Sequence, residues 1–220
     1  MKNRFATVAC GLALLLAAAP TICRAAVIYD NLSQPSAGYD GVGTGGLVQG
    51  PLYDSFSTGT GSGFQLTSVQ LLLSNGGGSA GTTSIGIYNN DTSTSPPSPG
   101  SLLATIGTVT TASLSGTASV WNVSLGSSLS LAASTRYWVG LSTSNNASTQ
   151  WWYSASGAGT GVANEFFSNS DGNFANAGDR PYQMAVNVVP EPSVCVMALA
   201  GVASVGWGLR RRRTPRALQS

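Results

Sequence analysis

The sequence predicts an all-β protein whose folded part is a single, jelly-roll-like β-sandwich, flanked by an N-terminal signal helix and a C-terminal transmembrane helix. Through the middle of the chain, short β-prone runs alternate with clusters of glycine, serine, asparagine and proline. Two of these runs alternate strictly between apolar and polar residues. No long apolar stripe has the 3.6-residue period of an amphipathic helix.

The expected strands are bounded by turn residues and each could place one face against a core. They are 27–29, 52–57, 64–74, 84–88, 102–109, 120–125, 135–142, 150–153, 165–168 and 182–189. The runs 75–78 and 89–93 are expected to be turns, and the proline-rich run 95–100 a rigid connector. The glycine-rich run 41–46 matches a dinucleotide-binding loop by letter only, because no helix can follow it, so a flexible loop is expected.

The first 25 residues have the layout of a secretory signal peptide. Lys2 and Arg4 precede an apolar run, 5–19, and small residues follow at Ala25 and Ala26, where cleavage is expected. The apolar run is short for a membrane span, so an uncleaved signal anchor is the less favoured alternative. This segment predicts export through the Sec translocon.

The C-terminus combines three features in a fixed order. The triplet Pro190, Glu191 and Pro192 comes first, an apolar run follows at 194–209, and four arginines close the segment: Arg210, Arg211, Arg212 and Arg213. Sixteen helical residues rise only about 24 Å against a hydrocarbon core of about 30 Å, a deficit that snorkelling arginines can cover. The arginines would hold this end in the cytoplasm.

This arrangement resembles the PEP-CTERM sorting signal of Gram-negative bacteria. The resemblance implies that the helix is a temporary anchor and that an exosortase, a membrane cysteine protease, cuts near the triplet. The chemistry would belong to the exosortase, so Pro190, Glu191 and Pro192 are recognition residues. The expected organisation is therefore a signal peptide (1–25), a sandwich (26–189), a sorting signal (190–213) and a short tail (214–220). A plain tail anchor is the alternative.

Composition excludes several classes of function for the middle of the chain. Residues 26–190 hold two arginines, Arg136 and Arg180, against seven acidic residues, a formal net charge of −5, which excludes a basic groove for nucleic acid. The chain has no histidine, and its cysteines (Cys10, Cys23 and Cys195) all lie outside this region. No Ser-His-Asp relay, disulfide or cysteine-based metal site can form there, and no cofactor is expected.

The most informative candidates for binding are four aromatic residues, Trp138, Trp151, Trp152 and Tyr153. On a strand, Trp151 and Tyr153 share one face while Trp152 takes the other, so one face is expected in the core and the other at a rim or on a platform. Core packing is the favoured interpretation and carbohydrate stacking the alternative.

Acidic residues offer weaker candidates. Asp54 and Glu165 are the only acids inside expected strands, and nothing in the sequence pairs them as a hydrolase requires. Residues 169–173, with Asp179 beyond them, fit a hydrated turn better than a calcium loop.

The middle of the chain also resembles the choice-of-anchor R type of domain. The similarity rests on Asp54-Ser55-Phe56 and on the runs 27–32, 101–107, 131–139 and 151–153. It implies a surface or extracellular domain. The sequence thus predicts an exported, non-enzymatic component of the cell surface, biofilm or exopolysaccharide matrix; the alternative is a carbohydrate-binding module.

Overall fold

The computed structural model describes residues 25–43, 50–60, 63–77, 81–143, 147–169, 174–176 and 178–191. All of its strands belong to one compact unit, Arg24–Pro190. The expected signal peptide before residue 25, Pro192, the apolar run 194–209 and the four arginines lie outside the described residues. Within the described part, no helix is long and apolar enough to span a membrane.

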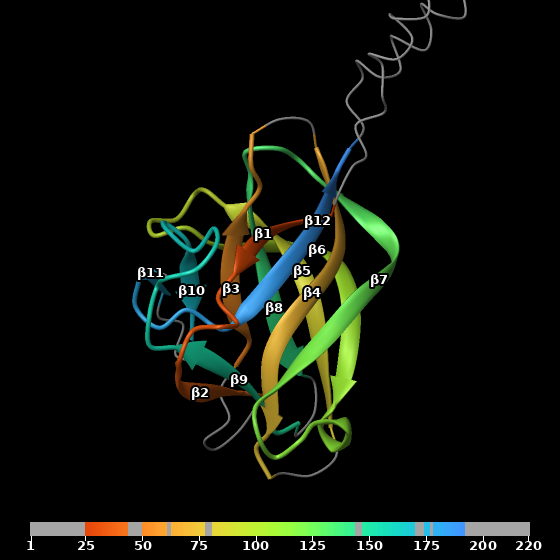
Figure 1. The fold of residues 1–220 in the computed structure, drawn as a ribbon, viewed down its shortest axis with the longest axis vertical. Coiled ribbons are helices and arrows are strands. Elements are labelled where there is room, and N and C mark those ends of the chain that lie inside the picture. Colours follow the sequence, from red (N-terminus) through yellow and green to blue (C-terminus); the bar gives the residue numbers. More distant parts are fainter. Residues whose placement is uncertain are drawn as a thin grey trace, which may run out of the picture. The chain divides into compact units, whose positions relative to one another are not determined.

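The described chain is all-β, as predicted, and forms two antiparallel sheets that face one another (Figure 1). Its strands in chain order are β1 (Ala26–Asp30), β2 (Ser36–Val42), β3 (Leu52–Ser57), β4 (Phe64–Asn75), β5 (Thr82–Asp91), β6 (Ser98–Thr110), β7 (Ser119–Leu131), β8 (Arg136–Thr143), β9 (Thr149–Ser154), β10 (Phe166–Ser168), β11 (Phe174–Asn176) and β12 (Met184–Pro190). One short 3-10 helix, η1 (Thr111–Ser113), precedes β7.

The strand order joins segments that are remote in sequence. The first sheet runs β1-β12-β4-β9-β2, with β7 on the other edge of β4, and the second runs β11-β10-β3-β8-β5-β6. Strand β4 therefore lies between β12 and β7, and β8 between β3 and β5. Such crossovers between sheets are typical of Greek-key sandwiches, although the described strands exceed the usual eight of a jelly roll.

A bulge in β4 keeps its apolar residues on the core side. Phe64 and Leu66 are buried, and the alternation then resumes one residue late at Val69, Leu71 and Leu73. Pairing with both β12 and β7 skips one residue of β4 between Leu66 and Ser68. The extra residue resets the period of two, so one long strand serves a single core face.

Strand β8 is covered on both faces. Val139 and Leu141 face the core, while Trp138 on the opposite face is also fully buried. A Cβ on Gly140 would lie 2.5 Å from the Tyr88 ring and 2.6 Å from the Tyr53 ring, so only glycine lets these two rings close over the strand. The rings meet edge to face with centroids 5.2 Å apart.

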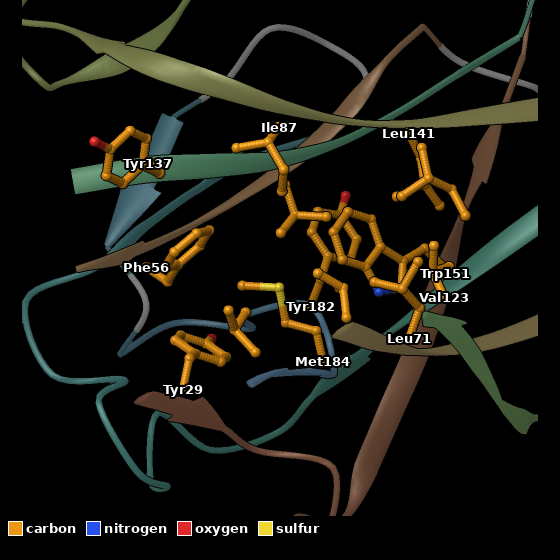
Figure 2. Packing of buried hydrophobic residues seen from close by; sticks show 14 of the residues in the cluster. Tyr29, Phe56, Leu71, Ile87, Val123, Tyr137, Leu141, Trp151, Tyr182 and Met184 are labelled. Carbon is orange, nitrogen blue, oxygen red and sulfur yellow. The ribbon is translucent and has the colours of Figure 1, made fainter. Parts of the chain in front are cut away.

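The core between the sheets is rich in aromatic side chains. Figure 2 shows Trp151 and Tyr182 packed with Leu71, Val123 and Met184. The three cysteines lie outside the described residues, so the described part of the sandwich is held by packing and hydrogen bonds.

The structure differs from the sequence prediction at polar segments. Strands β2 and β11 were not expected, and Gly41 and Val42 belong to β2 instead of a flexible loop. Residues 98–100, expected in a rigid connector, begin β6, and 89–91, expected in a turn, extend β5. In each case backbone pairing with a neighbouring strand overrides the local turn preference.

Candidate functional site

The sorting triplet begins inside the folded unit. Pro190 is the last residue of β12, where it pairs with Phe64 of β4, and β12 lies between β1 and β4. Proline has no backbone N–H, so it is tolerated at the end of a strand. Glu191 is the last described residue and is partly exposed. The triplet therefore begins within the last strand of the sheet, with no spacer between them.

Two of the four aromatic candidates cannot contact a carbohydrate. Trp138 and Trp151 are both 0% exposed. The Trp138 Nε1–H donates to Asn90 Oδ1 at 2.9 Å, and the Trp151 Nε1–H donates to the Gln183 carbonyl at 3.1 Å. Their apolar surface and their polar edges are both satisfied inside the protein. For these two residues the alternative of carbohydrate stacking is therefore wrong, and both are packed inside the protein, Trp151 in the core and Trp138 on the opposite face of β8.

Trp151 begins a connected set of rings between the sheets. It stacks on Tyr182 with centroids 4.6 Å apart and an interplanar angle of 17°. Tyr182 in turn meets Phe167 and Tyr153 edge to face, with centroids 5.8 Å and 6.5 Å away. The Tyr182 hydroxyl donates to Asp40 Oδ2 at 2.6 Å. Burial, together with the nearby Asp40 carboxylate, raises the pKa of Tyr182 far above its usual value.

Tyr153 reaches a polar pocket of about 270 Å³, to which both sheets contribute. The Arg180 guanidinium lies over the Tyr153 ring, 5.8 Å from its centroid. The Tyr153 hydroxyl occupies the space beside Gly38 that a Cβ would fill. The pocket is lined by Asp40, Tyr153, Phe167, Asn169, Ala175, Asp179 and Arg180. Tyr153 is thus partly exposed, but its ring is already in contact with protein groups.

Trp152 lies on the opposite face of β9, as the alternation predicts, and is partly exposed. Directly across the sheet it pairs with Tyr39 of β2, which is 48% exposed. Their ring centroids are 5.2 Å apart with an interplanar angle of 56°. Sequence reasoning missed Tyr39, because β2 was not expected to be a strand. Of the four predicted aromatic residues, Trp152 is therefore the one that forms an aromatic pair on the outer face of the sheet.

The structure brings together the two acids that the sequence left apart. Asp54 of β3 pairs along the sheet with Phe167 of β10, and Glu165 precedes that strand. The Ser55 hydroxyl and the Arg136 Nε–H both donate to Glu165 Oε2, at 2.6 Å and 2.9 Å. Asp54 is 0% and Glu165 2% exposed, so these carboxyls do not face a solvent-accessible substrate.

Asp54 occupies an environment that disfavours its charge. Burial first, and the nearby Glu165 carboxylate second, raise its pKa well above the usual value of a carboxyl group. The Tyr29 hydroxyl lies 3.5 Å from Asp54 Oδ2, while Oδ1 has no hydrogen-bond partner among the described residues. A neutral, protonated carboxyl fits this site better than a carboxylate.

In the part of the chain that the structure describes, no three acidic, histidine or cysteine side chains lie close enough together to hold a metal ion. Most of the segment weighed as a calcium loop, 170–173, lies outside the described residues. The first residue of that segment, Asn169, lines the Tyr153 pocket together with Asp179.

Comparison with known proteins identifies the C-terminal segment. The PEP-CTERM protein-sorting motif matches residues 188–213, which include Pro190, Glu191, Pro192 and all four arginines. A search of curated proteins returns no match to the chain. The motif indicates a protein that is exported and sorted to the cell envelope or surface of a Gram-negative bacterium, with an exosortase as its processing partner. The similarity of the middle to choice-of-anchor domains rests on the sequence pattern alone.

Proposed function

We propose that this chain is a non-enzymatic structural or adhesive component of the bacterial surface, biofilm or exopolysaccharide matrix. The observation that carries the proposal is the sorting motif at residues 188–213, which begins within β12, the last strand of the sandwich. A chain with this tail delivers its folded unit outside the cell, so the sandwich is the part that acts there.

The composition of the sandwich suits a role in a hydrated matrix. Between residues 26 and 190, 45 of 165 residues are serine or threonine, and the formal net charge of two arginines against seven acids is −5. Hydroxyl groups bind water without adding net charge to the surface. Because the unit has no cysteine, it has no disulfide that a change in redox conditions could break. The two buried acids have a structural role in this proposal, and the chain needs no cofactor.

Transient anchoring completes the proposal. The signal peptide would direct the chain through the Sec translocon, and the run 194–209 with Arg210–Arg213 would stop it in the inner membrane. The exosortase would then release the sandwich or transfer it to the cell surface. The alternative of a permanent tail anchor predicts instead that the arginines stay on the mature protein.

We expect the mature protein to end at or after Glu191, with 194–220 removed. Strand β12 is paired on both sides, and Met184, Val186 and Val188 are 0% exposed, so a protease cannot cut upstream of Pro190 without dismantling the sheet. Mass spectrometry of the protein from cells with and without the exosortase measures this terminus. A mature chain that retains Arg210–Arg213, or one that ends before Glu191, would contradict the expectation.

A matched pair of variants separates recognition from folding. Glu191→Gln with Pro192→Ala changes the triplet but leaves Pro190 at the end of β12, so the sandwich should fold and the uncleaved, membrane-bound precursor should accumulate. Asn187→Ser, in the same strand but outside the triplet, is the control and should be processed normally. Normal processing of the Glu191→Gln/Pro192→Ala chain would argue against recognition through this triplet.

A further inference from the structure

The outer face of the first sheet carries an aromatic pair that core packing does not explain. Tyr39 and Trp152 are cross-strand neighbours on β2 and β9, and their ring centroids are 5.2 Å apart. Tyr39 is 48% exposed and Trp152 partly exposed, whereas Trp151, the next residue along, is fully buried. Two rings on a solvent-facing sheet surface are costly to leave uncovered and are typical of binding sites.

The indole of Trp152 is held in place by a chain of hydrogen bonds. Its Nε1–H donates to Ser74 Oγ at 2.8 Å, and the Ser74 hydroxyl donates to Gln150 Oε1 at 2.7 Å. These bonds fix the edge of the ring against β4. A ring fixed in this way loses little conformational entropy when a ligand packs against it.

The described strands that flank the pair carry almost no charge, and the exposed Arg180 lies over Tyr153, whose side chain is on the opposite face of β9 from Trp152. Across the strands β2, β4, β7, β9 and β12, the only charged residue is Asp40. Asp40 faces the core side, where it accepts the hydrogen bond of the Tyr182 hydroxyl. Beside the rings the outer face presents the partly exposed side-chain amide of Gln150, and those of Gln70 and Asn122 further along, whereas Ser74 is buried beneath Trp152.

We propose that Tyr39 and Trp152 form a binding platform for an uncharged polysaccharide. Sugar rings offer apolar C–H faces that pack on aromatic rings, and hydroxyl groups that exchange hydrogen bonds with side-chain amides. A surface with almost no charge offers little electrostatic attraction to an anionic or cationic polymer. This inference rests on the proposed function, because it supplies the matrix ligand through which the exported sandwich would adhere.

A protein partner fits this surface less well. A stable protein interface buries about 800 Å² on each partner, with a hydrophobic centre. Two rings surrounded by amides and hydroxyls provide a small apolar area with many polar groups, which suits a narrow polyol chain. Further apolar exposure near the pair comes from Val120 of β7 and, in part, from its cross-strand partner Leu72 of β4.

Native gel electrophoresis of the full-length chain, in a detergent without sugar head groups, tests the platform. Gels contain hydroxyethyl cellulose, dextran, galactomannan or alginate, and retardation gives an apparent affinity. We expect retardation by at least one of the three neutral polymers and little by anionic alginate. Tyr39→Ala and Trp152→Ala should each weaken binding at least tenfold. Leu103→Ala, which removes a side chain of similar exposure (44%) from the second sheet, is the matched control.

Two further readouts separate binding from stability. Each variant's thermal unfolding is measured, and Tyr39→Ala, at an exposed position, should unfold near the wild-type temperature. Trp152→Phe keeps a ring but loses the Ser74 hydrogen bond, so it should bind more weakly than wild type and more tightly than Trp152→Ala. The proposal would be overturned if Tyr39→Ala bound as tightly as the wild type, or if Leu103→Ala weakened binding as much as Tyr39→Ala does. It would also be overturned if the wild type preferred alginate or bound none of the neutral polymers. None of these results affects processing of the tail.

Discussion

Replacing Trp151 with alanine is expected to lower the free energy of unfolding by about 3–5 kcal/mol. The side chain is 0% exposed, and its removal would leave a cavity beneath the Tyr182 ring that now stacks on it at 4.6 Å. The Gln183 carbonyl would also lose one of its two hydrogen-bond donors, the Trp151 Nε1–H, and keep the Leu72 N–H. Since domains are stable by only about 5–15 kcal/mol, this one change removes a large part of the total.

Urea unfolding of the wild type and the Trp151→Ala variant, followed by far-ultraviolet circular dichroism, measures this loss. The control is Trp152→Ala, the same substitution at the next residue of β9, on the partly exposed outer face. It should cost less than about 2 kcal/mol, because less apolar surface leaves the protein interior. Equal losses at the two positions would mean that the two faces of β9 are not divided into core and platform.

The sequence predicted this division because it is local. The period of two in a strand places Trp151 and Trp152 on opposite faces whatever the rest of the fold does. The same reasoning could not find Tyr39. Its strand β2 reads as serine, alanine and glycine with few apolar residues, and it is a strand because it pairs with β9, more than 100 residues later.

Pairing across the chain also explains what the sequence could not say about the acids. Asp54 was correctly placed in a strand, and Glu165 was expected at the start of another, but their proximity depends on the contact between β3 and β10. The hydrogen bond from Ser55 to Glu165 spans 110 residues. No local pattern encodes such a contact, whereas the sorting signal is a linear motif and could be identified without any fold.

The buried Asp54 carboxyl is expected to make the sandwich less stable as the pH rises. In the unfolded chain this group loses its proton near pH 4, while burial keeps its pKa higher in the folded protein. Between these two pKa values the folded state binds more protons than the unfolded state. The contribution of Asp54 to stability is therefore complete below about pH 4 and is lost with rising pH, by at most about 1.4 kcal/mol for each pH unit.

Asp54→Asn removes this titration, because a neutral amide replaces a carboxyl group that is itself neutral in the folded protein. Urea unfolding at intervals from pH 4 to pH 8 should show that the free energy of unfolding of the variant increases relative to that of the wild type as the pH rises. Asp91→Asn is the control: hydrogen bonds from Ser93 lower the pKa of the exposed Asp91 carboxyl, so any stability that it contributes is lost as the pH falls. That loss falls below about pH 4, so the stability curves of Asp91→Asn and the wild type should stay parallel from pH 4 to pH 8, while those of Asp54→Asn and the wild type diverge. Parallel stability curves for the wild type and Asp54→Asn would show instead that Asp54 is ionised in the folded sandwich.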